Sequence, residues 1–123
     1  MAKLQGETIL QKNMVSYLMR KGITCWVNKN SATYDSRKKV FRKNNTKKGI
    51  SDILGLLKTS GKMIAIEVKM PKKYATPDQK AFLKDINDNG GIGFIARTNE
   101  DLDHHLGEFY HSAHSKTITH RTS

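Results

Sequence analysis

The sequence predicts a single mixed α/β domain, in which a mixed β-sheet is flanked by helices. Three observations predict it: an apolar stripe of helical spacing near the N-terminus, two apolar stretches joined by a short turn, and a helix signal followed by a further strand. The length of 123 residues suits one domain, which we place at 1–110, with a flexible tail at 111–123. We expect the order αβββαβ with an extra C-terminal helix.

The first helix is predicted over residues 7–21. Leu10, Met14 and Leu18 recur every four residues, so they form one apolar stripe along a helix. Gly22 follows as the residue that ends the helix, because glycine readily adopts the left-handed conformation found there. The chain therefore opens with an amphipathic helix.

Three strands are predicted next, over residues 23–27, 50–57 and 63–70. The second and third are separated by the short turn sequence Thr59-Ser60-Gly61-Lys62. A link this short favours an antiparallel hairpin.

A second helix begins after Thr76, with threonine as the N-cap, Pro77 at the first position and Gln79 at the third. A strand over residues 92–96 follows, which gives a βαβ unit with parallel strands. Asn99 is the expected cap of a last helix.

The positive charge of the chain is concentrated in one segment. The net charge is +11, and eight basic residues against one acidic residue lie between positions 29 and 48. So many like charges repel one another unless an anion neutralises them, which favours a polyanionic partner over a merely solvated loop. We read this segment as a long loop or irregular hairpin that contacts DNA, and Lys72 and Lys73 as further backbone contacts. The expected contacts in the segment are Lys29, Asn30, Ser31, Arg37, Lys38, Lys39, Arg42, Lys43, Lys47 and Lys48.

Other protein classes are excluded by composition. The single cysteine, Cys25, rules out an internal disulfide framework and a thiolate zinc cluster. No apolar run approaches the roughly 20 residues of a membrane span, and no apolar signal segment is visible. We expect a soluble protein of the cytoplasm, in a bacterium or a phage-infected host.

Charged residues inside apolar strands are the most informative feature. Glu67 and Lys69 alternate with the apolar residues of the third strand and therefore project from one face. Asp52 lies in the same kind of apolar setting one strand earlier, and a hairpin would bring it near Glu67. Two adjacent carboxylates repel unless a hard divalent cation such as Mg²⁺ or Mn²⁺ lies between them.

These residues match a known pattern. Gly49-Ile50-Ser51-Asp52 followed by Ile66-Glu67-Val68-Lys69 resembles the PD-(D/E)XK nuclease superfamily. Within it, the chain is most similar from about Glu7 to Leu102 to the virus-type replication-repair nuclease group, VRR-NUC, which is related to archaeal Holliday-junction resolvases. The first motif departs from the pattern by carrying Ser51 where a proline is common. The resemblance implies a restriction-endonuclease-like core.

The resemblance also implies roles for individual residues. Asp52, Glu67 and the main-chain carbonyl of Val68 would bind the metal, and Lys69 would position the nucleophilic water. Related enzymes often add a glutamate from the first helix, and Glu7 is the only acidic residue before Asp35. Gln79 would orient Lys69 or the scissile phosphate.

Each assignment has a plainer alternative. Glu67 and Lys69 could be an ion pair on a solvated sheet, Glu7 could favour the helix dipole, and Gln79 could serve a capping box. Other residues receive no site role. We expect Trp26 and Phe94 to lie in the core and not to stack on bases, and the histidines to lie on the surface, namely His104, His105, His111, His114 and His120.

The expected function is metal-dependent hydrolysis of DNA phosphodiesters, and the resemblance suggests branched or Holliday-junction DNA and 5′-phosphate products. Paired incisions favour a homodimer, for which the last helix offers Leu102, Leu106 and Phe109. The alternatives are a flap or nicking nuclease, a restriction-like endonuclease, an inactive DNA-binding module of the same fold, and a basic ribosomal or RNA-binding protein.

Overall fold

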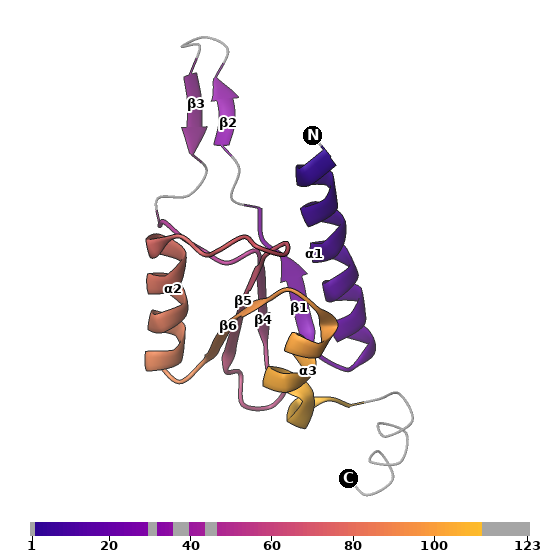
Figure 1. Ribbon diagram of the computed structural model, residues 1–123. Coiled ribbons are helices and arrows are strands. Elements are labelled where there is room, and N and C mark those ends of the chain that lie inside the picture. Colours follow the sequence, from indigo (N-terminus) through magenta and orange to yellow (C-terminus); the bar gives the residue numbers. More distant parts are fainter. Residues whose placement is uncertain (1, 30–31, 36–39, 44–46, 112–123) are drawn as a thin grey trace, which may run out of the picture.

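The computed structural model describes residues 2–29, 32–35, 40–43 and 47–111. For residues 2–5, 32–35 and 40–43 it describes the backbone only. The helices and strands form the expected mixed α/β domain, with two more strands, β2 and β3, in the basic segment than the predicted order contains (Figure 1). They are α1 (Ala2–Arg20), β1 (Thr24–Val27), β2 (Ala32–Asp35), β3 (Val40–Lys43), β4 (Ile53–Leu56), β5 (Met63–Val68), α2 (Pro77–Asp88), β6 (Ile92–Ala96), α3 (Asn99–Leu106) and a 3₁₀ turn, η1 (Gly107–Phe109).

The main sheet has four strands in the order β1-β4-β5-β6. β4 pairs antiparallel with β1 and with β5, while β5 pairs parallel with β6 across the α2 crossover. The predicted hairpin and βαβ unit are therefore confirmed. β2 and β3 form a separate antiparallel ribbon, so the basic segment contains a hairpin (Figure 1).

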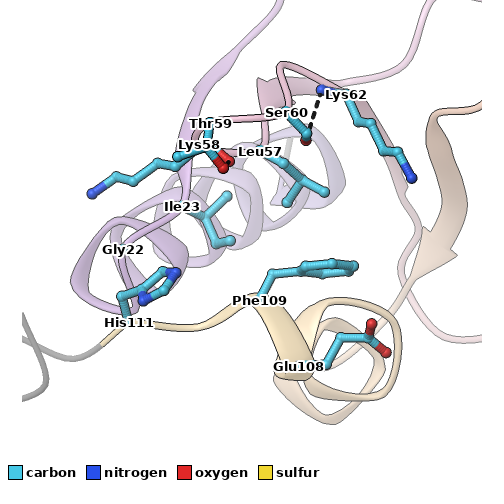
Figure 2. Close-up of a pocket in the computed structure, with 10 residues that line it drawn as sticks. All are labelled: Gly22, Ile23, Leu57, Lys58, Thr59, Ser60, Lys62, Glu108, Phe109 and His111. Atoms are coloured by element: carbon cyan, nitrogen blue, oxygen red, sulfur yellow. Dashed lines mark hydrogen bonds between the residues drawn. The ribbon is translucent and has the colours of Figure 1, made fainter. Parts of the chain in front are cut away.

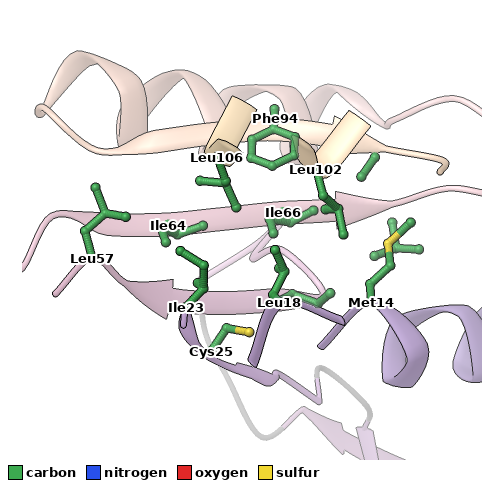
Figure 3. Packing of buried hydrophobic residues seen from close by; sticks show 13 residues of the cluster. Met14, Leu18, Ile23, Cys25, Leu57, Ile64, Ile66, Phe94, Leu102 and Leu106 are labelled. Carbon is green, nitrogen blue, oxygen red and sulfur yellow. The ribbon is translucent and has the colours of Figure 1, made fainter. Parts of the chain in front are cut away.

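The two faces of the sheet are covered to different extents. α1 and α3 cover one face and bury the larger apolar cluster, much of which Figure 3 shows. α2 packs against β5 and β6 on the other face, over a smaller cluster of Ala65, Phe82 and Leu83. Side chains of the larger cluster are Met14, Leu18, Ile23, Cys25, Ile53, Leu57, Ile64, Ile66, Val68, Phe94, Ala96, Leu102 and Leu106.

Helix signals in the sequence hold with small corrections. α1 begins at Ala2, five residues before the predicted start, and Gly22 ends it with a φ of 89°. The capping box of Thr76 and Gln79 is present at α2. The cap of α3 is Thr98 and not Asn99, because the hydroxyl of Thr98 accepts the N–H of Asp101.

Two expectations about apolar residues are wrong. Trp26 is 45% exposed, whereas Phe94 lies in the core as predicted. Leu102 and Leu106 are fully buried in the core of their own chain, because α3 packs them against the sheet. These two leucines are therefore not available for a subunit interface.

Candidate active site

The predicted catalytic residues come from segments that meet at one edge of the sheet. Asp52 directly precedes β4, Glu67 lies near the end of β5, and Lys69 follows that strand by one residue. The N-terminal half of α1, the first turn of α2 and the connections to the β2–β3 ribbon lie at the same edge (Figure 1). This edge carries the candidate active site.

Asp52 is fixed by the backbone of the neighbouring strand. Its Oδ2 atom accepts a hydrogen bond of 2.9 Å from the N–H of Val68. The register pairs Ile53 with Ile66, so Asp52 continues the ladder opposite Glu67. The antiparallel hairpin therefore brings together two carboxyl groups that are separated by fourteen residues in the sequence.

Glu67 is a buried carboxyl with unsatisfied hydrogen-bonding capacity. The residue is 1% exposed, and its Oε1 atom has no hydrogen-bond donor among the described residues. A buried carboxylate oxygen without a donor is costly. The ion pair of Glu67 with Lys69 is present, but it does not lie on a solvated surface as the plainer alternative supposed. The burial indicates a site that is completed by a proton or a cation.

The two carboxyls perturb each other's titration. Burial raises the pKa of Glu67 to about 8, and the charge of Asp52 and a hydrogen bond with its carboxyl act in the same direction. Burial also raises the pKa of Asp52, although the Val68 N–H opposes that shift. Without a cation, the pair therefore retains a proton near neutral pH.

Lys69 provides the positive charge beside this pair. Its Nζ atom lies 3.6 Å from Oε2 of Glu67, and its side chain is 14% exposed. The backbone N–H of Lys69 donates to the carbonyl of Ala96, which ties the residue to β6. The ammonium group is held between the buried carboxyl and the surface, where a phosphate can reach it.

Glu7 lies toward the same edge but its role as a ligand stays a prediction. A Cβ built on the adjacent Gly6 would lie 3.5 Å from Cε of Met70, so α1 passes close to the end of β5. Glu7 is partly exposed and lies in the second turn of α1, which excludes the first-turn dipole reading. Within the described ranges, no three His, Cys, Asp or Glu side chains lie close enough to hold a metal ion.

Gln79 serves the capping box at the start of α2. Its Oε1 accepts the N–H of Thr76 at 2.8 Å, and its own N–H donates to Oγ1 of Thr76. The side-chain oxygen is thus engaged, whereas the amide NH₂ group could still donate to a phosphate. A direct site role for Gln79 stays a prediction.

The structure explains why the first motif carries a glycine at position 49. Its φ is 76°, and a Cβ there would lie 2.2 Å from the carbonyl oxygen of Asp78. The chain that leaves the basic segment therefore passes directly over the first turn of α2 before it reaches Asp52. At the other end of the segment, the N–H of Asn28 donates to the carbonyl of Asp52 at 2.7 Å.

The predicted DNA contacts lie partly within the described residues. Lys29, Lys47, Lys48, Lys72 and Lys73 are exposed at or near the site edge. Arg42 and Lys43 lie on β3, without described side chains. Outside the described residues are Asn30, Ser31, Arg37, Lys38 and Lys39.

Sequence reasoning missed two further features of this edge. Asn28 donates from its side chain to the carbonyl of Ser51, as well as from its backbone to Asp52. Arg97 lies over the ring of Tyr74 and donates to the carbonyl of Lys73, which fixes the connection between β5 and α2. In the sequence, Asn28 directly follows a predicted strand and Arg97 directly follows another. These positions were the only signals available, and neither indicates which group the side chain contacts.

A pocket of about 280 Å³ lies away from the carboxylates, between the turn after β4 and the end of the described chain. Figure 2 shows Lys58, Thr59 and Phe109 among its lining residues. None of the predicted site residues lines it, so this pocket is separate from the candidate active site.

The donor set at the edge fits a divalent cation. Hard cations such as Mg²⁺ prefer carboxylate and carbonyl oxygens, and they favour the ionised form of a carboxyl pair that burial otherwise protonates. The buried, unpaired Oε1 of Glu67 is the atom that such a cation would satisfy. Asp52 and Glu67 are the residues that would hold it.

The strand order and the Asp–Glu–Lys arrangement define a nuclease of the PD-(D/E)XK type, a class that typically uses divalent metals. A model of the VRR-NUC domain matches residues 7–99. The chain therefore belongs to the VRR-NUC family, and we conclude that it is a DNA-binding hydrolase. Comparison with curated proteins and with solved structures gave no match. Within the described part of the chain, no helix is both long and apolar enough to cross a membrane.

Proposed function

We propose that the protein is a metal-dependent, structure-selective DNA endonuclease that cuts branched DNA, Holliday junctions included, and leaves 5′-phosphate ends. The observation that carries the proposal is the buried pair of Asp52 and Glu67 with Lys69 beside it. The alternatives with the same site are a flap or nicking nuclease and a restriction-like endonuclease. A third alternative is an inactive DNA-binding module, but the presence of Asp52, Glu67 and Lys69 disfavours it.

Each residue has a chemical task in this proposal. Asp52, Glu67 and the carbonyl of Val68 would hold Mg²⁺ or Mn²⁺, and Glu7 on α1 would complete the set. The bound ion would supply Lewis acidity and lower the pKa of a water molecule. The ammonium group of Lys69 orients the attacking water and stabilises the negative charge that develops on the phosphate. Hydrolysis then breaks the bond from phosphorus to the 3′-oxygen.

The remaining parts of the proposal concern partners. The basic segment and the lysines after β5 would hold the DNA backbone, since a chain of net charge +11 is attracted to phosphates. Symmetric incisions of a junction favour a homodimer. Its interface would lie outside the buried leucines of α3. The proposed location is the cytoplasm of a bacterium or of a phage-infected cell.

Cleavage of labelled DNA tests the proposal. Four-way junction, flap, nicked and linear duplex substrates are incubated with Mg²⁺, Mn²⁺ or EDTA, and Asp52→Ala and Lys69→Met are compared with the wild type. We expect metal-dependent incision of branched substrates by the wild type, and binding without incision by both variants. Cleavage by Asp52→Ala would refute the assignment of the site, and cleavage in EDTA would refute the metal dependence.

A further inference from the structure

The chain has one tryptophan, and it lies on the surface. Trp26 in β1 is 45% exposed, although tryptophan is strongly buried on average. Leu56 on β4 and Met63 at the start of β5 are 42% and 36% exposed. Trp26 and Leu56 define the open half of the α2 face, formed by β1 and β4, which α2 leaves uncovered because it packs on β5 and β6; Met63 lies at the border of that half.

The register places Trp26 beside the candidate active site. Trp26 pairs with Leu54, which pairs with Ala65 of the small cluster under α2, so all three lie on one face. The next pair on that face, Asn28 with Asp52, is joined by the Asn28 N–H. Trp26 therefore lies about 7 Å along the strand from the residue that is bonded to Asp52.

The face around Trp26 suits a nucleic-acid strand. Lys29, three residues beyond Trp26, is exposed, and the chain carries a net charge of +11. A groove of about 570 Å³ opens farther along the same face, between α2 and the start of β5, and Trp26 does not line it. An exposed indole on a basic protein matches single-stranded DNA, whose bases stack while its phosphates pair with cations.

A second copy of the chain is the competing occupant. Stable interfaces bury about 800 Å² on each partner, and three partly exposed side chains supply a small part of that area. The observations favour DNA.

We propose that Trp26 is a stacking platform for an unpaired base next to the scissile phosphate. The inference rests on the proposed nuclease function and narrows its substrate to DNA with unpaired nucleotides at the branch. Bases inside a duplex are stacked on their neighbours and cannot offer a face to the indole. Flaps, bubbles and open junctions would then be cut in preference to continuous duplex.

Intrinsic fluorescence reports on this contact directly, because Trp26 is the single tryptophan. We would titrate the full chain in EDTA with a short single strand and with a duplex of equal length, and follow emission together with the anisotropy of labelled DNA. Strong quenching by the single strand and weak quenching by the duplex are expected. Anisotropy that saturates without quenching would overturn the proposal, and so would a DNA-independent blue shift with protein concentration, which indicates a second copy on this face.

Cleavage by variants provides the second test. Trp26→Ala should cut a flap at least about tenfold more slowly while cutting of continuous duplex changes little, and Trp26→Phe should recover most of the loss. Leu56→Ala, on the same open half but one pair farther from the site, is the matched control and should cut like the wild type. Equal losses on flap and duplex with Trp26→Ala would overturn the stacking role. Loss of all metal-dependent cutting in the wild type would instead refute the nuclease proposal.

Discussion

Replacement of Glu67 by glutamine should stabilise the metal-free protein while it abolishes cleavage. The wild-type carboxyl is buried beside Asp52, and its pKa is raised to about 8 from an ordinary value of 4.5. Between these values the folded state holds a proton that the unfolded state has lost. The free energy of unfolding must therefore fall as the pH rises from about 4.5 to about 8.

The size of the effect follows from the same two values. The fall amounts to at most about 1.4 kcal/mol per pH unit, and to at most about 4 kcal/mol between pH 4.5 and pH 8. Glutamine is neutral at every pH and nearly isosteric with glutamate. The free energy of unfolding of Glu67→Gln should therefore not show this decrease with pH. We expect the variant to be more stable than the wild type at pH 8 and about equal to it at pH 5.

Urea unfolding in EDTA at pH 5, 6.5 and 8 measures the difference, with Glu108→Gln as a control for an exposed carboxylate away from the site. Mg²⁺ should raise the midpoint of the wild type at pH 8 more than that of Glu67→Gln, because the ion favours the ionised pair. A wild type as stable at pH 8 as at pH 5, with a parallel profile for Glu67→Gln, would refute the reasoning.

Three further predictions follow from other residues. Gly49→Ala should lower the free energy of unfolding by about 2 kcal/mol or more and slow cleavage, because a Cβ at position 49 would clash with Asp78. Gly61→Ala is the control for backbone strain alone, since Gly61 has a φ of 73° and nothing lies within 4 Å of its Cβ position. Equal losses for the two variants in urea unfolding would exclude the clash. Ser51→Ala should be neutral or stabilising by up to about 1 kcal/mol, because Ser51 is fully buried and its Oγ has no partner in the described part of the chain; a clear loss of stability would show that the hydroxyl is satisfied. The third change replaces four residues of the basic segment by glutamine, namely Lys38, Lys39, Arg42 and Lys43. It should weaken DNA binding and reduce the slope of log affinity against log salt concentration by about 0.9 for each lost phosphate contact. An unchanged slope would show that the basic segment does not contact DNA.

The fold could be predicted where local signals agree with tertiary packing. Thr76, Pro77 and Gln79 form a complete helix start, and the turn after β4 leaves little choice but a hairpin. The start of α1 could not be predicted as well, because residues 2–6 lack the apolar stripe that identifies the rest of the helix. The cap of α3 was misplaced by one residue because asparagine and threonine are both good caps.

The candidate site was predictable from charge in an unfavourable place. Asp52, Glu67 and Lys69 interrupt apolar strands, and the structure brings them together. Trp26 was misassigned because the exposure of a strand residue depends on which part of the sheet a helix covers, and α2 reaches β5 and β6. Leu102 and Leu106 were misassigned as interface residues because periodicity identifies an apolar face of a helix but not what covers it.

The way in which the two ends of the basic segment are attached affects how such a nuclease could change its preferred DNA structure. Asn28 is bonded to the residue before β4, and Gly49 is packed on the first turn of α2, so both ends are held independently of what lies between them. Residues 30–46 can then vary in length and composition while the chemistry at the sheet edge persists. Evolution, or an engineer, could exchange this insertion to redirect the same catalytic centre to a different DNA shape.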